Sequence, residues 1–133
     1  MKRTYTPPTV PLEDAEQRII FQWAAMSAAA CPELGLLYAI PNGGKRAIKT
    51  AIALKAQGVK SGVPDMCLPV ARNGHHGLYI ELKRQKGGVV SETQKSWITA
   101  LAKQGYKAVV CRGAEEAIGT IKEYRWEHTS TKT

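Results

Sequence analysis

Three side chains in the middle of the chain have the types and the spacing needed to hold a metal ion. Asp65 follows Pro64, and Glu81 and Lys83 stand two residues apart in an apolar run. Side chains two apart in a strand share a face, so Glu81 and Lys83 would project together. Two carboxylates beside one ammonium suit a single hard divalent cation with a water next to it. The competing interpretation is a cross-strand ion pair at a surface, which is worth only ~0–1 kcal/mol.

The surrounding pattern predicts the elements that would position these side chains. Strands are expected over 65–70 and 77–83, joined by the polar, glycine-containing turn 72–76, which would bring Asp65 close to Glu81. Further strands are expected over 36–40 and 106–111, and helices over 13–30, 45–57, 91–104 and 114 to about 124. The resulting order, α-β-α-β-β-α-β-α, predicts an α/β fold with a mixed central sheet flanked by helices. The last strand–helix–strand step implies one parallel pair.

Two of these helices carry details that bear on the site. In the helix over 45–57, Ile52 and Leu54 are expected to point inward, and Trp97 is expected on the apolar face of the helix over 91–104. Gln94 stands three residues after Ser91, which is the spacing of a capping box. That pattern explains Gln94 without any ligand, so its role in a site is an open alternative.

The length of 133 residues, with 44% hydrophobic residues, predicts one domain with a core of its own. We expect a flexible arm over 1–12, a globular domain over 13–127 and a loose tail over 128–133. The N-terminal residues lack the apolar stretch of a secretory signal, which favours a cytoplasmic protein. The three cysteines are odd in number and widely separated, which favours reduced thiols over disulfides or structural zinc.

The positive charge is concentrated in the middle of the chain. The net charge is +8, and residues 41–112 hold thirteen basic against three acidic side chains. A localised excess of this kind in a small domain indicates a polyanionic partner, most often nucleic acid. The candidate metal residues fall within the same segment.

Five motifs, taken in order, resemble the VRR-NUC family of the PD-(D/E)xK nuclease superfamily. They are Glu13-x-x-x-Gln17, Gly58-Val-Lys-Ser-Gly-Val-Pro-Asp65, Ile80-Glu-Leu-Lys83, Gln94 at the start of a helix, and Val109-Val-Cys-Arg-Gly113. The resemblance covers roughly residues 13 to 121 and implies a core like that of the restriction endonucleases. Cys111 and Arg112 stand in a motif that varies among relatives, so no catalytic role is assigned to them.

The resemblance implies a role for each of these residues. Asp65, Glu81 and the backbone carbonyl of Leu82 would bind Mg²⁺ or Mn²⁺, and Lys83 would orient the attacking water or stabilise charge in the transition state. Glu13 would reach the site from the first helix, with Glu16 as the fallback. An acid in a first helical turn also has a purely structural explanation in the helix dipole. Gln94 would line the site.

Contact with DNA is expected from basic and glycine-rich positions outside the carboxylate pair. A helix N-terminus with free backbone N–H groups and neighbouring cations can bind a phosphate. The candidate residues are Asn42, Gly43, Gly44, Lys45, Arg46, Lys49, Lys60, Arg84 and Lys86. Each one alone is more simply an ordinary surface residue. The pair His75-His76 is interpreted as a polar turn, since adjacent turn residues point apart.

The expected activity is that of a metal-dependent, structure-selective endodeoxyribonuclease, similar to a Holliday-junction resolvase and working as a homodimer on branched DNA. The alternatives are a less selective nicking nuclease, or a repair or restriction nuclease that a partner protein directs. A non-catalytic DNA-binding module of the same fold is a further alternative, which the intact Asp65, Glu81 and Lys83 disfavour. An RNA-binding protein is disfavoured because the few aromatic residues fall mostly on predicted core stripes.

Overall fold

A computed structural model describes residues 10–41 and 48–126 of the chain. The elements along the chain are α1 (Glu13–Ser27), the 3₁₀ helix η1 (Pro32–Leu36), β1 (Tyr38–Ala39), α2 (Ile48–Ala56), β2 (Met66–Leu68), β3 (Leu78–Lys83), α3 (Glu92–Lys103), β4 (Lys107–Arg112) and α4 (Ala114–Trp126). Residues 1–9 of the expected arm over 1–12, the stretch 42–47, and residues 127–133, which include the expected tail over 128–133, lie outside the described residues. No helix in the described ranges is both long and apolar enough to cross a membrane.

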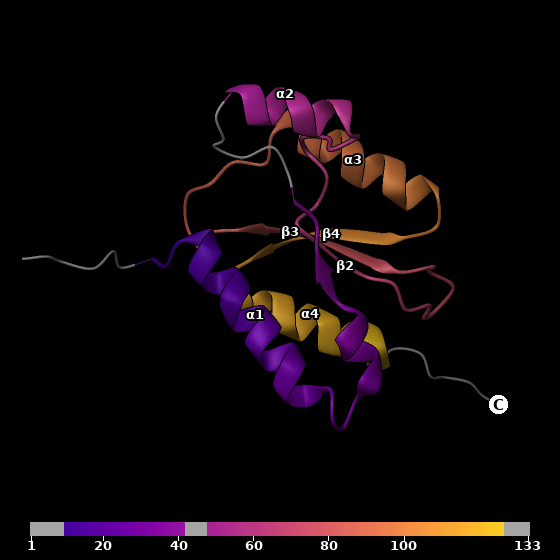
Figure 1. The fold of residues 1–133 in the computed structure, drawn as a ribbon. Coiled ribbons are helices and arrows are strands. Elements are labelled where there is room, and N and C mark those ends of the chain that lie inside the picture. The colour runs from indigo at the N-terminus through magenta and orange to yellow at the C-terminus, as the bar shows by residue number, and fades with distance from the viewer. Residues whose placement is uncertain (1–9, 42–47, 127–133) are drawn as a thin grey trace, which may run out of the picture.

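The four strands form one mixed sheet in the order β1-β2-β3-β4. The β1–β2 and β2–β3 pairs are antiparallel, and the β3–β4 pair is parallel. Helices α1 and α4 cover one face of this sheet, while α2 and α3 lie over the other (Figure 1). The predicted α/β class, with a parallel pair formed late in the chain, is therefore confirmed.

The hydrophobic core lies between the sheet and the α1–α4 layer. The side chains with 0–1% exposure there include Ile20, Met66, Ile80, Leu82 and Ile121. Because side chains alternate along β3, Leu78, Ile80 and Leu82 enter this core. The residues between them, Glu81 among them, are left for the opposite face.

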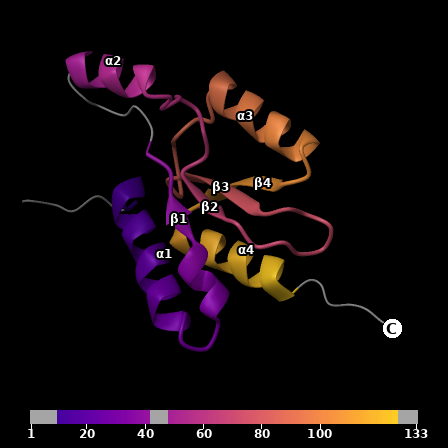
Figure 2. The ribbon, with the colours of Figure 1, turned by 45° about the vertical axis from the view of Figure 1, so that its right-hand side comes forward.

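The α2–α3 layer covers its face less completely. No residue of α3 is fully buried. Ile52 of α2 was expected to point inward, but 63% of it is exposed, so that prediction is wrong. The reason is that α2 stands away from the sheet (Figure 2). Even Ala51 and Leu54 of this helix are only half-buried.

The turn between β2 and β3 fixes the register of the two strands. Arg72 and His75 exchange two backbone hydrogen bonds, of 3.1 and 2.8 Å, around Asn73 and Gly74. Both central residues have positive φ, 48° and 80°, as a type I′ turn requires, and Asn-Gly is the preferred pair for it. The predicted hairpin connection is therefore confirmed.

Within the described residues, none of the three cysteines forms a disulfide. Cys67 and Cys111 are buried, and Cys31 is half-buried.

Candidate active site

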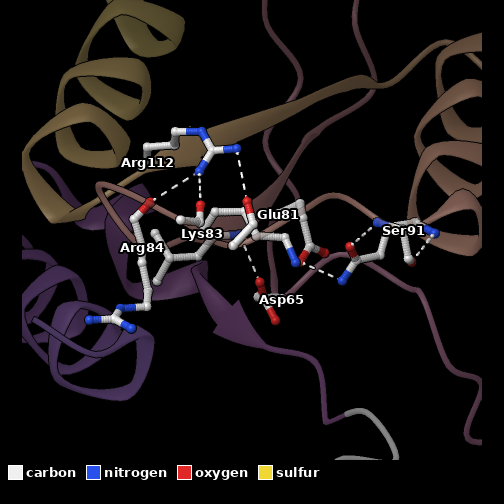
Figure 3. Close-up of polar contacts among 10 residues, drawn as sticks. Asp65, Glu81, Lys83, Arg84, Ser91 and Arg112 are labelled. Carbon is white, nitrogen blue, oxygen red and sulfur yellow. Dashed lines mark hydrogen bonds and ion pairs between the residues drawn. The ribbon is translucent and has the colours of Figure 1, made fainter. Parts of the chain in front are cut away.

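Strands β2 and β3 bring the predicted acidic pair to one end of the sheet. Met66 is paired with Ile80, so Asp65, which directly precedes β2, lies next to Glu81. Because Leu78, Ile80 and Leu82 enter the main core, Glu81 and Lys83 project from the other face of β3. Figure 3 shows both side chains near Asp65. Both are buried, with 2% and 7% exposure. Such burial is unusual for a charged pair, and it argues against the surface ion pair considered above.

Each of the two carboxylates is held by a specific contact. Asp65 Oδ2 accepts a hydrogen bond of 2.7 Å from the backbone N–H of Leu82. Glu81 Oε2 accepts one of 3.0 Å from Gln94 Nε2 and lies 3.7 Å from Lys83 Nζ. The three side chains predicted to converge are therefore together, and Gln94 joins them from the start of α3.

Gln94 forms the predicted capping box and also donates a hydrogen bond to Glu81. Its backbone N–H donates to Ser91 Oγ at 3.1 Å, and its Oε1 accepts from the Ser91 backbone N–H at 2.9 Å. This is the predicted capping box, and it uses only the Oε1 end of the amide. The Nε2 end is left to donate to Glu81. The cap thus fixes the rotamer of a side chain that contacts the site.

Burial governs the charge state of the acidic pair. The pKa of Glu81 is raised from 4.5 to about 8, first by desolvation and next by the negative charge of Asp65, while the charge of Lys83 opposes the shift. Burial also raises the pKa of Asp65, against the hydrogen bond from Leu82. When two neighbouring carboxyl groups are both shielded from water, ionisation of one disfavours ionisation of the other. Near neutral pH the metal-free pair therefore retains a proton that a cation would displace.

The donor atoms present fit a hard divalent cation. Glu81 Oε1 is buried and has no hydrogen-bond partner within the described residues. An orphaned buried carboxylate oxygen is costly unless a ligand completes it. Across residues 10–41 and 48–126, no group of three His, Cys, Asp or Glu side chains could hold a metal alone. A cation here would need backbone carbonyl, water or phosphate oxygens as well, which is usual for Mg²⁺.

The structure separates the two candidate acids of α1. Glu13 faces the site, because its carboxylate and the Lys83 side chain both lie close to Gly88. A β-carbon placed on Gly88 would be 3.9 Å from Glu13 Oε2 and 3.7 Å from Lys83 Cδ. The charge of Glu13 also contributes to the raised pKa of Glu81. The buried Glu16 instead accepts hydrogen bonds from the Ala114 N–H at 3.2 Å and from Gln85 Nε2 at 2.9 Å. Glu16 thus caps α4, and Glu13 is the acid that lies toward the pair.

The loop that follows β3, residues 84–88, is held in place by Arg112. Arg112 Nη1 donates to the carbonyls of Arg84 at 3.3 Å and Gly87 at 2.7 Å, and its Nη2 donates to that of Gly88 at 3.1 Å (Figure 3). This contact was not predicted. It depends on the parallel register that places Arg112 beside Lys83, and no local pattern in the sequence specifies that register.

The predicted DNA contacts differ in how available their side chains are. Lys49, Lys60 and Lys86 are exposed. Arg84 is not available in the same way, because its guanidinium donates to the carbonyls of Val10 at 2.8 Å and Pro11 at 3.3 Å. The remaining candidates, Asn42, Gly43, Gly44, Lys45 and Arg46, lie outside the described residues.

His75 and His76 do not contribute to the site. His76 packs edge-on against Tyr106 with ring centroids 5.7 Å apart, and His75 lies 6.5 Å from Tyr124. Both contacts are made at the turn between β2 and β3. Strand β3 runs from this turn to Glu81 and Lys83 near its other end.

Two of three comparisons with known proteins give matches, and these two agree with each other. The family model described as the VRR-NUC domain matches residues 11–115. A solved structure described as a VRR_NUC domain protein is similar over 87% of this chain and 89% of its own, with 32% identity and a TM-score of 0.75. No curated protein matches. The matched range contains both carboxylates, Lys83, Gln94 and Arg112.

Proposed function

The chain belongs to the VRR-NUC family, and on that premise we propose that it is a metal-dependent endodeoxyribonuclease selective for branched DNA. A domain of this family is a nuclease-type domain, for which DNA is the substrate class. One observation carries the catalytic proposal. Glu81 is buried beside Asp65 and Lys83, with one carboxylate oxygen held by Gln94 and the other without a partner in the described chain.

The residues around that oxygen divide the work of phosphodiester hydrolysis. Asp65, Glu81 and the Leu82 carbonyl would hold Mg²⁺ or Mn²⁺, with Glu13 reaching it directly or through water. When bound, such a cation would polarise the scissile phosphate and acidify a water. Gln94 keeps Glu81 oriented, so that Oε1 is presented. Asp65 is fixed in the same way by the Leu82 N–H.

Lys83 would stabilise the negative charge that develops on the phosphate oxygens. Its ammonium is buried on the same strand face as Glu81, at 3.7 Å, so little reorganisation is needed as charge builds up. A cation held in place beforehand stabilises a transition state more than a mobile surface lysine would. Positioning and charge stabilisation are therefore its proposed role, in preference to proton abstraction.

The proposed substrate is a four-way junction or related branched DNA, and the proposed active species is a homodimer. Two active sites related by a two-fold axis can cut two strands of a junction symmetrically, and this symmetry is the commonest one for oligomers. Sedimentation of the protein with and without junction DNA tests the dimer. A single species with the monomer mass under both conditions would exclude it.

The decisive experiment compares cleavage of a synthetic four-way junction with cleavage of a linear duplex of the same sequence. Wild type, Glu81→Ala and the control Glu123→Ala, which removes an exposed acid from α4, are each assayed with Mg²⁺, Mn²⁺ or EDTA. We expect metal-dependent cutting of the junction that is lost only in Glu81→Ala. Equal cutting of both substrates would indicate a less selective or partner-directed nuclease. Binding without cutting would indicate a DNA-binding module.

A further inference from the structure

A groove of about 510 Å³ lies between α2, the segment that follows it, and α3. This volume falls within the ~300–1,000 Å³ typical of small-ligand sites. The lining of the groove includes Leu54, Lys55, Val59, Lys60, Ser61 and Trp97.

The lining combines one aromatic side chain with uncompensated positive charge. Trp97 is half-buried, so part of its indole is accessible. Lys55 and Lys60 are exposed, the lining contains no carboxylate, and neither lysine has an acidic partner within the described part of the chain. An aromatic surface next to cations suits a nucleotide, whose base stacks and whose phosphate is anionic.

Both walls of the groove continue into the catalytic pair. On α3, Trp97 lies three residues after Gln94, on the same helical face, and Gln94 donates to Glu81. On the other wall, the segment containing Ser61 leads to Asp65 four residues later. Three residues of an α-helix rise about 4.5 Å along its axis, and this distance separates the backbone position of Trp97 in the groove from that of Gln94 beside Glu81.

We propose that this groove binds an unpaired nucleotide of the substrate, with its base against Trp97 and its phosphate between Lys55 and Lys60. The occupant is unpaired because base faces inside a duplex are stacked and cannot reach an indole. The inference rests on the proposed function in taking DNA as the substrate. It adds the reason why a branched or single-stranded segment next to the cleavage point would be preferred over continuous duplex.

The test measures binding of a fluorescent thymidine oligonucleotide and of a blunt duplex in EDTA, where metal-dependent cleavage does not occur. Trp97→Ala removes the stacking surface, Trp97→Phe keeps it, and Ala51→Phe fills the groove from α2, whose Ala51 also lines it. Trp126→Ala is the matched control for Trp97→Ala, since it removes an exposed tryptophan outside the groove, and Lys103→Ala controls for the loss of one exposed positive charge outside the groove. Circular dichroism and thermal unfolding establish that each variant is folded.

We expect Trp97→Ala and Ala51→Phe to weaken oligonucleotide binding about 5- to 150-fold, the range for loss of one stacked base. Trp97→Phe and the controls should stay within about twofold of wild type, and duplex binding should change little. Unchanged oligonucleotide binding in folded Ala51→Phe and Trp97→Ala would overturn the proposal. So would a change in protein mass in Ala51→Phe without a change in DNA binding, because the groove would then hold a second copy.

The outcomes separate this inference from the proposed function. If oligonucleotide binding depends on Trp97 but the protein cleaves no substrate, nucleotide binding in the groove is supported and the nuclease proposal is refuted. If cleavage depends on Glu81 but oligonucleotide binding does not change in the Trp97 and Ala51 variants, the nuclease proposal is supported and nucleotide binding in the groove is refuted.

Discussion

Glu81 combines burial, a neighbouring charge and an unused ligand atom in one side chain. It is 2% exposed, lies between Asp65 and Lys83, and leaves Oε1 unpartnered among the described residues. Desolvating an ionised carboxylate is costly, so a site of this kind is unfavourable until a cation or a proton occupies it. Two consequences at the scale of single residues can be measured.

Without metal, the stability of the fold should depend on pH. The folded-state pKa of Glu81, about 8, lies above its ordinary value of 4.5, so the folded protein keeps a proton that the unfolded chain has lost. The free energy of unfolding in EDTA should therefore fall by a few kcal/mol as pH rises from about 4.5 to about 8. Glu81→Gln should lose this slope, and Mg²⁺ should reduce it in wild type. Urea denaturation at pH 5 and pH 8 measures it, and equal slopes in both proteins would contradict the assignment.

The second concerns the role of Lys83. Lys83→Met keeps the length of the buried side chain but removes the ammonium, so metal-dependent cleavage should fall about 10²–10³-fold, as when one preorganised charge stabiliser is lost. Steady-state cleavage of the junction at saturating Mg²⁺ measures the effect. If Lys83→Met kept nearly full activity while Asp65→Ala lost it, Lys83 would have no catalytic role.

At the scale of elements, the site depends on two contacts that join segments distant in sequence. Glu16 links α1 to the start of α4 and to the loop after β3, through Ala114 and Gln85. Arg112 links the end of β4 to the same loop. Both hold backbone or side-chain groups that border Lys83 and Glu13, so each should affect the site without contacting substrate.

The two acids of α1 should respond differently to substitution. Glu16→Ala leaves the Ala114 N–H and the Gln85 amide without their acceptor and should destabilise the fold by about 1–3 kcal/mol. Glu13→Ala should lower cleavage with little change in stability, because Glu13 lies toward the site. Asp14→Ala, which removes an exposed pair with Arg18, is the control and should cost ~0–0.5 kcal/mol. Urea denaturation and the junction assay separate the cases. A stable, poorly active Glu16→Ala would reverse the assignment.

Arg112 should control the order of the loop over 84–88. Arg112→Lys keeps the charge but cannot span the carbonyls of Arg84, Gly87 and Gly88, because only a guanidinium has the required forked geometry. Backbone hydrogen exchange over 84–89 should therefore accelerate in both Arg112→Lys and Arg112→Ala, and cleavage should drop. Arg18→Lys, on the exposed side of α1, provides the control. Exchange that is unchanged in Arg112→Ala would show that other contacts hold the loop.

At the scale of the whole molecule, the charge of +8 should make DNA binding strongly salt-dependent. Each phosphate contact on duplex DNA adds about 0.9 to the slope of log affinity against log salt. On junction DNA, Lys60→Gln and Lys86→Gln should each reduce this slope by about 1 if the lysine meets a phosphate. Arg84→Gln should leave the slope unchanged, because its guanidinium is engaged by Val10 and Pro11. Titrations at several salt concentrations measure the slopes, and a nearly flat dependence would exclude a phosphate-binding surface.

Local patterns in the sequence were enough to locate the α-helices, the strands and the candidate site residues, but not the 3₁₀ helix η1. Apolar periodicity located the helices and the paired strands. The Asn-Gly turn after β2 and the capping box at Ser91 are local, since their hydrogen bonds join residues a few positions apart. The spacing of Glu81 and Lys83 sufficed to place both on one strand face, because side chains alternate along any strand.

Tertiary structure alone decided which side chains contact one another across the fold. Three such features are the different surroundings of Glu13 and Glu16, the hydrogen bonds of Arg84 to Val10 and Pro11, and those of Arg112 to the loop over 84–88. All of them depend on packing angles and on the register between β3 and β4. The exposure of Ile52, against its apolar pattern, likewise reflects where α2 lies relative to the sheet. These features join residues far apart in sequence. Local patterns do not encode such contacts, because they form only when the whole core has packed.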